Sequence, residues 1–390
     1  MNYILSDGEV RNSLLPFTFT RPVGAIRVGI LTIAEKWEKW LATPVSFGTE
    51  DYLSRKFPLN ISETNVVIEA SYLPNADLVK AIQRLPIKSA LVKDNSVIAY
   101  VTENPSIAYS SDDYDLVTFS GEVVRIRHPW DIFSKNDVAI RMDYDLLTKG
   151  RESQPISSTN TVIGEAIFME EGATVEASIL NATTGPIYIG KHAQIMEGSI
   201  VRGALALCDH AILKMGSKIY GASTFGPYCK VGGEVSNAVL FAYSNKGHEG
   251  FLGNSVLGEW CNLGADTNTS NLKNNYAPVR LWNYETQGFA KTGLQFCGLM
   301  MGDHSKAGIN TMFNTGTVVG VSSNMFGSGF PRNFVPSFTW GGAHGFSTYR
   351  TNKAFETAKA MMGRRGVEFD NIEQEILEHV FQLTEQWRNY

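Results

Sequence analysis

The feature that most constrains the fold is a six-residue repeat in the middle of the chain. An aliphatic or aromatic residue returns at every sixth position without a slip over eight positions. These positions are Ile189, Ile195, Val201, Leu207, Leu213, Ile219, Phe225 and Val231. The period returns at Leu257 and again between Met301 and Val319, often with glycine next in sequence. A period of six matches neither the 3.6-residue turn of a helix nor the alternation of a single strand.

This period fits short parallel strands that are joined by tight corners. Glycine adopts the backbone angles of such corners at little cost. The aliphatic residue points inward and stacks on its equivalent one coil away. The repeat therefore predicts a left-handed parallel β-helix with three hexads per coil. Since the repeated positions form its core, we expect functional residues where the repeat is interrupted.

The two ends of the chain have other patterns. Short apolar runs at 65–68, 89–92 and 96–100 alternate with helical patterns at 30–40 and 76–82, which indicates an α/β layer. Helical spacing after residue 353 predicts one or two helices that cover the open end of the β-helix. We predict an α/β domain at 1–125, a linker helix at 126–158, the β-helix at 159–345 and a C-terminal helical segment at 346–390.

Charge and cysteine content narrow the class of protein. The chain has 34 Lys and Arg residues against 39 Asp and Glu residues, so its net charge is −5. Proteins that bind nucleic acid or anionic membranes usually have an excess of basic residues, so this balance does not favour such partners. The four cysteines lack metal-site spacing and are too few for a disulfide framework. No apolar run approaches the roughly 20 residues that span a bilayer, and the acidic start does not resemble a signal peptide. We expect a soluble cytoplasmic protein that acts on small molecules.

The segment 245–271 begins in the interruption of the repeat between Val231 and Leu257, and it carries a known motif. It resembles the active-site segment of the bifunctional UDP-N-acetylglucosamine pyrophosphorylase and glucosamine-1-phosphate N-acetyltransferase family, which runs Lys-Ala-Gly-His, Tyr-Leu-Gly-Asp, Asn-x-Gly-Ala-Gly-Thr and a closing Asn. The matching residues are Gly247, His248, Leu252, Gly253, Gly258, Asn262, Gly264, Ala265, Thr267 and Asn271. The resemblance implies a reduced sugar nucleotidyltransferase-like domain at 1–125, a hexapeptide-repeat acyltransferase domain behind it, and a divergent bacterial branch.

The resemblance also implies roles for single residues. Acetyl transfer to a sugar amine requires the amine to lose a proton, and neutral imidazole has a suitable basicity near pH 7. His248 is therefore the candidate base and acetyl-CoA the cosubstrate. By resemblance, Asn271 holds the imidazole or the acyl oxygen, and the backbone amide near Ala265 donates to the oxyanion. Asn262 binds the sugar.

The chain departs from the family in the residues that bind substrate. The family places a phosphate-binding Lys after the Glu that matches Glu234, but this chain has serine and asparagine there. Phe251 occupies the place of the Tyr that follows the family's His. A sugar phosphate still needs cationic or amide donors. The candidate replacements are Lys214, Lys218, Lys230 and Lys246, and Lys218 falls at the family's phosphate-binding Arg position.

The front of the chain resembles sugar nucleotidyltransferases less completely. Residues 14–22 match their Leu-x-Pro-Leu-Thr segment, so Arg11 and Arg21 are candidates for nucleotide binding and Glu69 for metal binding. The glycine-rich loop that brings backbone amides to a triphosphate is missing. We therefore expect UTP and Mg²⁺ as ligands only if this domain is active. The alternative interpretation is that the front domain is a degenerate nucleotidyltransferase domain that is kept for structure or regulation.

The leading hypothesis is an acetyl-CoA-dependent N-acetyltransferase that acts on an amino-sugar 1-phosphate, with glucosamine-1-phosphate favoured, in the synthesis of UDP-N-acetylglucosamine. Uridyl transfer is left open as a second activity. The resemblance implies a homotrimer, and a cyclic trimer suits a three-sided prism. His304 beside Asp303 is a rival base, and Arg364 with Arg365 could meet the 3′-phosphate of coenzyme A. The alternatives are a sugar-1-phosphate nucleotidyltransferase whose β-helix serves assembly, and a non-catalytic sensor or scaffold of sugar nucleotides.

Overall fold

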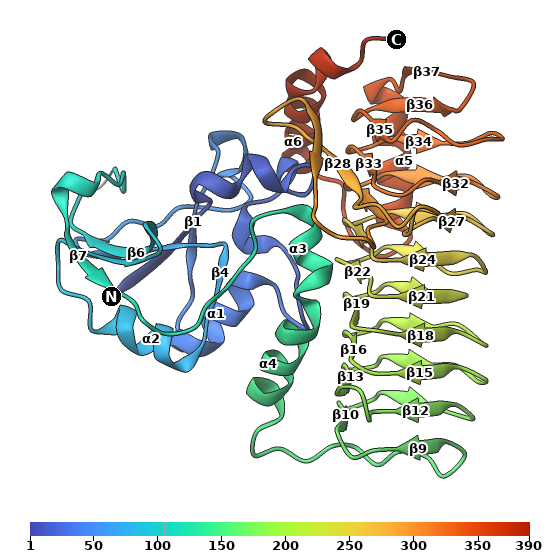
Figure 1. The fold of residues 1–390 in the computed structure, drawn as a ribbon, viewed down its shortest axis with the longest axis horizontal. Helices are drawn as coiled ribbons and strands as arrows, with labels where there is room; N and C mark the ends of the chain where they lie inside the picture. Colours follow the sequence, from blue (N-terminus) through green and yellow to red (C-terminus); the bar gives the residue numbers. More distant parts are fainter. Residues whose placement is uncertain (105) are drawn as a thin grey trace.

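The computed structural model describes residues 1–104 and 106–390, and it has an α/β front domain, a long β-helix and C-terminal helices (Figure 1). The front domain is built on one six-stranded mixed sheet flanked by helices. In sheet order its strands are β2 (Ser46–Gly48), β1 (Asn2–Ser6), β3 (Asn65–Glu69), β6 (Ser96–Thr102), β5 (Ser89–Lys93) and β7 (Asp115–Thr118). The helices are α1 (Ile33–Leu41) and α2 (Ala76–Gln83), and strands β4 (Tyr72–Leu73) and β8 (Val124–Arg125) form a small antiparallel pair. The predicted strands and helices of this region are confirmed.

The predicted parallel β-helix is also confirmed, and its coils form three faces. Face 1 consists of β10 (Ile167–Met169), β13 (Ile187–Ile189), β16 (Leu205–Leu207), β19 (Ser223–Phe225), β22 (Val239–Leu240), β25 (Val256–Leu257), β30 (Leu299–Met301), β33 (Thr317–Val319) and β35 (Phe334–Val335). Face 2 consists of β11 (Thr174–Val175), β14 (Gln194–Ile195), β17 (Ile212–Leu213), β20 (Lys230–Val231), β23 (Asn245–Lys246), β26 (Asn262–Leu263), β31 (Lys306–Ala307), β34 (Asn324–Met325), β36 (Thr339–Gly342) and the antiparallel β37 (Gly345–Thr348). Face 3 consists of β9 (Thr161–Ile163), β12 (Ile179–Asn181), β15 (Ile200–Arg202), β18 (Lys218–Tyr220), β21 (Glu234–Ser236) and β24 (Phe251–Gly253). All eight positions of the six-residue repeat are buried in the prism core.

The corner between faces 1 and 2, called corner 1–2, carries a column of aromatic rings. Its members are His192, His210, Tyr228, Tyr243, Trp260 and His304, and each has a left-handed backbone with φ between 53° and 61°. Neighbouring rings are stacked with centroid separations from 4.2 to 6.3 Å. Ring stacking between coils offsets part of the cost of left-handed angles in residues that carry a side chain.

One long arm leaves the prism between Asn271 and Cys297. The arm contains the hairpin of β28 (Arg280–Asn283) and β29 (Gly288–Lys291). The prism continues across it, because β25 pairs with β30, and β27 (Asn268–Thr269) pairs with β32 (Met312–Phe313). The two ends of the arm meet, since the amide of Cys297 donates to the carbonyl of Asn271 at 2.9 Å. This interruption is the one that the repeat pattern did not anticipate.

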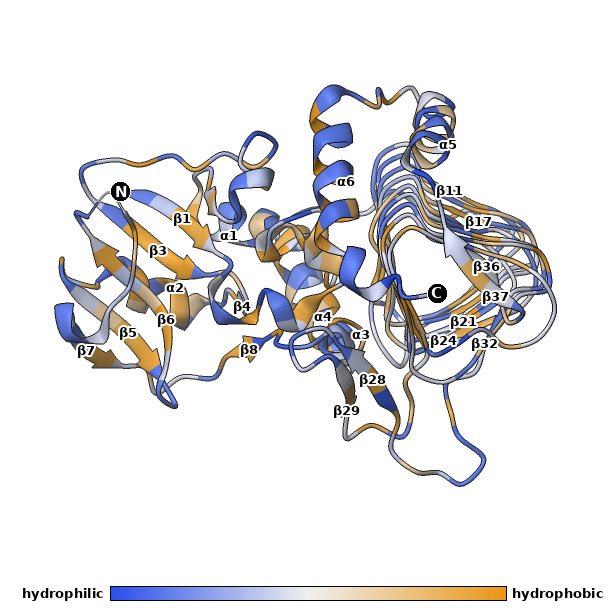
Figure 2. Ribbon diagram, turned by 90° about the horizontal axis from the view of Figure 1, so that it is seen from above, coloured by the Kyte–Doolittle hydropathy of each residue, from blue (hydrophilic) through white to orange (hydrophobic). Residues whose placement is uncertain are grey.

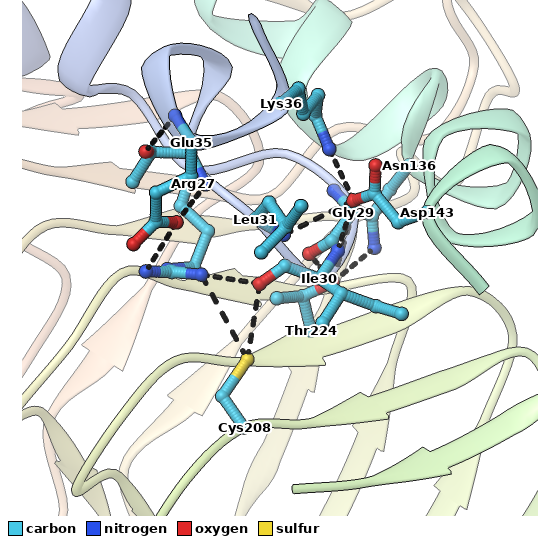
Figure 3. A network of polar contacts seen from close by, with 11 residues as sticks. Arg27, Gly29, Ile30, Leu31, Glu35, Lys36, Asn136, Asp143, Cys208 and Thr224 are labelled. Carbon is cyan, nitrogen blue, oxygen red and sulfur yellow. Dashed lines mark hydrogen bonds and ion pairs between the residues drawn. The ribbon is translucent and has the colours of Figure 1, made fainter. Parts of the chain in front are cut away.

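The front domain docks on face 1 through a buried polar network (Figure 3). The region predicted as one linker helix forms α3 (Pro129–Ser134) and α4 (Asn136–Thr148). From α4, Asn136 accepts from the amide of Gly29 at 2.7 Å and donates to Thr224 of face 1 at 3.0 Å. Asp143 of α4 pairs with Lys36 of α1 and accepts from the amide of Ile30 at 2.7 Å. These bonds satisfy the buried polar groups, so front domain and prism form one packed body.

The two C-terminal helices pack on different sides of the prism. Helix α5 (Thr351–Gly363) lies beside face 2, and α6 (Asn371–Leu383) lies between the front domain and the prism (Figure 2). Ring packing of Phe338 on Phe381 ties α6 to the prism, and ion pairs of Arg55 and Lys56 tie it to the front domain. None of the helices in the described residues is long and apolar enough to cross a bilayer.

Candidate functional site

A cavity of about 590 Å³ lies between face 2 of the prism and the end of α5. It is bounded on one side by the corner between faces 2 and 3, called corner 2–3, and on the other by Tyr243 and Trp260 of corner 1–2. Its lining residues are Lys214, Lys230, Tyr243, Asn245, Gly247, His248, Trp260, Asn262, Leu263, Gly264, Ala265, Ile309, Met361, Arg364 and Arg365. The lining, which lies wholly within the described residues, includes no Asp or Glu. The cavity therefore suits an anionic ligand with an apolar or aromatic part.

His248 stands on corner 2–3 at the edge of this cavity. The corner is formed by the turn Gly247–Gly250 between β23 and β24, and the His248 side chain is exposed. Its backbone carbonyl accepts from the ammonium of Lys246. An accessible imidazole beside a cationic cavity can take a proton from a bound amine. The structure thus places the predicted base where a substrate can reach it.

Four cations gather in the cavity from two separate parts of the chain. Lys214 and Lys230 come from the prism, whereas Arg364 and Arg365 come from the end of α5. Arg365 donates to the side-chain oxygen of Asn245 at 3.0 Å, which fixes its guanidinium over face 2. Burial lowers the pKa of Lys230, and the neighbouring charges of Arg365, Lys214 and Arg364 lower it further. Such mutual repulsion is relieved when an anion binds among the four groups.

Two more of the predicted residues share the cavity with His248. Asn262 of β26 lines its floor, and Ala265 lies on corner 2–3 one coil beyond His248. The carbonyl of Ala265 accepts from the amide of Asn310 at 2.9 Å. Within the described residues the Ala265 amide donates to no other group, so it is free to bind a ligand oxygen. A backbone amide without an internal partner is the kind of donor that an oxyanion site uses.

Three predicted substrate-binding residues lie on face 3, around the corner from the cavity. Lys218, Glu234 and Phe251 are register partners on β18, β21 and β24, so they form one outward column. Lys218 also pairs with Glu249 of corner 2–3 at 3.7 Å, and both side chains are more than half exposed. Within one chain these three residues do not line the cavity of His248, although they lie next to its corner.

Asn271 is not brought to His248 within the chain. It lies near the third corner, where its side-chain amide donates to Asn254 at 2.8 Å and its carbonyl accepts from Cys297 at 2.9 Å. Contact between Asn271 and His248 was predicted because both belong to one short sequence motif. The motif extends over more than one coil, so His248 and Asn271 lie at different corners of the prism.

The predicted nucleotide and metal residues of the front domain have other partners. Arg11 donates to the carbonyl of Thr18 at 2.9 Å and to the hydroxyl of Tyr52 at 2.7 Å, beside a cavity that is rich in carboxylates. Glu69 forms a two-point ion pair with Arg125, with both distances at 2.8 Å. Within the described residues no three His, Cys, Asp or Glu side chains gather as a metal site. The surroundings of Glu69 therefore do not fit Mg²⁺, and those of Arg11 offer little to a triphosphate.

Arg21 belongs to the domain interface rather than to a nucleotide site. It is buried, pairs with Glu259 at 2.8 Å and with Asp303, and lies 5.2 Å from the ring centroid of Phe241. Burial opposes its charge, but Asp303 and Glu259 outweigh burial and raise the pKa of Arg21. The guanidinium of Arg21 therefore joins the front domain to the prism and is not available to a nucleotide.

The prediction that His304 is a rival base is wrong, because His304 is also enclosed near the domain interface. Its side chain is buried, and the carboxylate of Asp303 binds Arg21, Thr20 at 2.6 Å and the amide of Glu259 at 2.8 Å. Burial, aided by Lys306, holds the pKa of His304 well below its usual value. A group enclosed in this way has no path to a substrate amine.

The sequence reading missed the aromatic wall of the cavity. The coil from Val231 to Lys246 has 15 residues, whereas the coil before it, from Leu213 to Val231, has 18. The places of Tyr243 and Trp260 on corner 1–2 could therefore not be counted from the six-residue repeat. The pair Arg364–Arg365 was visible as a cationic dipeptide after a helical pattern. Only the packing of α5 on face 2 shows that it meets Lys214 and Lys230.

Comparison with known proteins agrees with this two-part plan. Residues 3–152 match the family model described as sugar nucleotidyl transferase. The bifunctional protein GlmU of Methanocaldococcus jannaschii is 29% identical over 206 residues, which are 50% of this chain and 41% of that protein. The uncharacterized acetyltransferase YaiX of Escherichia coli is 24% identical over 164 residues, or 42% of this chain and 70% of that protein. The chain thus covers less than half the length of its GlmU relative.

Solved structures give looser matches. The polySia specific acetyltransferase NeuO is 12% identical, with a TM-score of 0.27 over 54% of this chain and 99% of that chain. A UDP-N-acetylglucosamine acyltransferase is 11% identical, with a TM-score of 0.21 over 58% of this chain and 81% of that chain. Residues 3–152 thus resemble sugar nucleotidyl transferases, and about half of the chain is distantly similar to bifunctional GlmU proteins, at 28–29% identity.

Proposed function

We propose that this protein is an acetyl-CoA-dependent N-acetyltransferase that acts on an amino-sugar 1-phosphate, with glucosamine-1-phosphate as the favoured acceptor. One observation carries the proposal: an accessible imidazole, His248, shares a cavity with four cations and with no carboxylate. Both substrates are anionic, since coenzyme A has phosphates and the acceptor has one. These four cations supply the charge-assisted hydrogen bonds that phosphate groups need.

The chemistry assigned to the residues is a single acyl transfer. The amine nitrogen attacks the thioester carbonyl carbon, and His248 takes the proton that the amine gives up. The free amide of Ala265 donates to the oxyanion that forms. When the C–S bond breaks, the thiolate takes the proton back from His248, so that N-acetyl sugar and free coenzyme A leave and the imidazole is again neutral.

The aromatic wall and the arginines suggest which part of the cavity meets which ligand. Tyr243 and Trp260 give the cavity an aromatic border, and because their ring faces are stacked within the column of corner 1–2, a flat group such as adenine would meet the edges of these rings. Arg364 and Arg365 lie on the same side of the cavity as α5, so we assign them to the phosphates of coenzyme A. Lys214, which belongs to corner 2–3 near His248, is then the favoured contact of the sugar phosphate.

Nucleotidyl transfer by the front domain is the second candidate function, because residues 3–152 match the sugar nucleotidyl transferase family. The contacts of Arg11, Arg21 and Glu69 count against it. We therefore propose that the front domain chiefly supports the prism and that UTP with Mg²⁺ is not required for acetyl transfer. Four buried, unpaired cysteines and an acetyl-CoA cosubstrate support a cytoplasmic setting.

We also propose a homotrimer. Face 1 is covered by the front domain and part of face 2 by α5, whereas face 3 remains uncovered. Large apolar side chains stand on that face: Ile163, Ile179, Ile200 and Tyr220 are 38–49% exposed. In a cyclic trimer of prisms, the column of Lys218, Glu234 and Phe251 would face a neighbouring chain and could complete an acceptor site there.

The first test is an assay for free thiol with acetyl-CoA and glucosamine-1-phosphate. We expect thiol release by the wild type and a loss of about 100-fold or more in His248→Ala, since general bases contribute about 10²–10⁴-fold. His192→Ala is the matched control, because His192 is an exposed histidine of corner 1–2 outside the cavity. Release that persists in His248→Ala rejects His248 as the base. No release by a folded wild type rejects this acceptor or the acyl transfer.

A further inference from the structure

Lys246 points into the core of the prism, where the repeat elsewhere places apolar residues. It pairs in register with Val231, and the same inward column contains Leu213, Leu263 and Ala307. The Lys246 side chain is only 2% exposed. A lysine in such a place needs an explanation, because an ammonium loses its hydration there.

The ammonium has one hydrogen-bond partner in the described residues, the backbone carbonyl of His248. The charged groups that face it are Glu249 of the same corner and Asp266 of the next coil, and both favour its protonated form. Burial is the larger effect and lowers the pKa of Lys246 to about 8. Lys246 is therefore still charged at neutral pH, and its hydrogen bond to the carbonyl is charge-assisted.

The bond acts on the corner that carries the candidate base. Corner 2–3 has Gly247 on one side of His248 and, two residues on, Gly250 at φ 114°, so the backbone around His248 has little rigidity of its own. A donor fixed inside the prism holds the carbonyl inward and leaves the imidazole on the outer side of the corner.

We propose that Lys246 is a positioning residue for His248: from inside the prism its ammonium fixes the turn from which the imidazole enters the cavity. This inference rests on the proposed function for its catalytic meaning, but the geometric part is independent of it. It explains why a charge is retained in an apolar column, since an apolar residue there would pack at least as well.

The variant Lys246→Met tests this, because methionine keeps an unbranched apolar side chain of similar length and removes the ammonium. We expect kcat to fall about 10–100-fold, since small misplacement of a catalytic group has effects of about this size. KM for acetyl-CoA should stay within about twofold, since the cations of the cavity are untouched. Stability in urea at pH 7 should be unchanged or higher, because the variant removes a buried charge.

The pH dependence has a definite sign. In the unfolded chain Lys246 titrates near its ordinary value of 10.5, whereas the folded pKa is about 8. Between these values the unfolded state binds more protons, so the wild type gains stability as pH rises from about 8 toward 10.5. Any stability advantage of Lys246→Met at pH 7 should therefore shrink at pH 10. A variant that is less stable at pH 7 and has unchanged kcat contradicts the proposal.

The control is Lys306→Met. Lys306 also has a pKa lowered by burial to about 8 and donates to a histidine carbonyl, that of His304, at 2.7 Å, but on corner 1–2. Its kcat should stay within about twofold of the wild type. An equal loss of kcat in both variants would show a general effect of buried lysines and would overturn the positioning role.

A measurement that does not depend on enzyme activity can test the role of Lys246 separately from the proposed function. Hydrogen–deuterium exchange of the peptide 245–253 should be faster in Lys246→Met than in the wild type, and in Lys306→Met it should not change. If the wild type releases no thiol, the proposed function fails while the exchange result still decides the role of Lys246. Equal exchange in the wild type and Lys246→Met overturns it.

Discussion

At the scale of single residues, positive charge defines the cavity of His248, since its lining has four cations and no carboxylate. Arg365 is the best-fixed member of the cationic group, because Asn245 holds its guanidinium. We predict that Arg365→Ala raises KM for acetyl-CoA about tenfold or more and leaves kcat near the wild-type value, since a hydrogen bond to a charged group contributes about 1.5–3 kcal/mol. Steady-state kinetics with varied acetyl-CoA measures both constants.

The control for this prediction is Lys359→Ala. Lys359 is an exposed cation of the same helix that does not line the cavity. It should leave both constants unchanged. A rise in KM for the sugar phosphate instead of acetyl-CoA in Arg365→Ala would exchange the assignments of the two anionic ligands.

The sequence motif predicts which residues lie close together in space only where the prism keeps them on the same face or corner. His248, Asn262 and Ala265 line one cavity because each belongs to face 2 or to corner 2–3. Asn271 lies beyond the next corner, which a linear motif does not reveal. The sequence offered Lys246 as a candidate for phosphate binding, but the structure buries it in the prism core. Its inward position could not be counted from the six-residue period, because Lys246 pairs with Val231 after 246 − 231 = 15 residues, whereas Val231 pairs with Leu213 after 231 − 213 = 18.

At the scale of elements, the segment that precedes α1 acts as an anchor. Arg21 lies in this segment and meets two carboxylates of the prism, Glu259 and Asp303. We predict that Arg21→Met lowers the free energy of unfolding by about 3–5 kcal/mol, because it leaves buried carboxylates without their cation. Urea denaturation measures this loss. Binding of UTP, followed by calorimetry, should be the same in variant and wild type.

A double variant tests the cause. If the loss comes from the unpaired carboxylate, Arg21→Met combined with Asp303→Asn should cost less than the sum of the two single changes. Strict additivity would contradict the ion pair as the cause. Loss of UTP binding without loss of stability would restore the nucleotide-binding interpretation of Arg21.

The elements themselves divide into those that a sequence can predict and those that it cannot. The β-helix was predictable because its spacing is local: each coil repeats the last, so eight positions in a row already specify the core. The docking of α4 on face 1 depends on contacts such as Asn136 with Thr224, which are 88 residues apart. No local pattern encodes such a pair, and the same holds for α5 over the cavity.

At the scale of the whole molecule, the uncovered face 3 decides the assembly. We predict a trimer of three times 43.0 kDa in light scattering, and monomers when Ile179 and Ile200 are both replaced by Glu. Charges at these positions would be buried without partners in an interface. Acetyl transfer should fall with the loss of trimer if a neighbour completes the acceptor site.

The matched control is Val138→Glu, since Val138 is 46% exposed on α4, outside face 3. It should remain trimeric and active. A wild type that is monomeric at micromolar concentration would reject the trimer, and full activity in the monomeric double variant would confine the site to one chain.

The arm between Asn271 and Cys297 leaves and rejoins the prism at the same point, and the coils close across it. The hairpin of the arm packs between the front domain and the prism: Leu281 and Tyr284 are buried, and the ring of Tyr284 contacts Phe19 of the front domain and Phe334 of the prism. Descendants of such a chain can therefore vary the exposed turns at 274–276 and 285–287, and so acquire new binding partners, without changing the coils or the buried strand of the hairpin. The coils and the buried strand of the hairpin are the constant part of the molecule, and the two exposed turns of the arm are the part in which substitutions and insertions are tolerated.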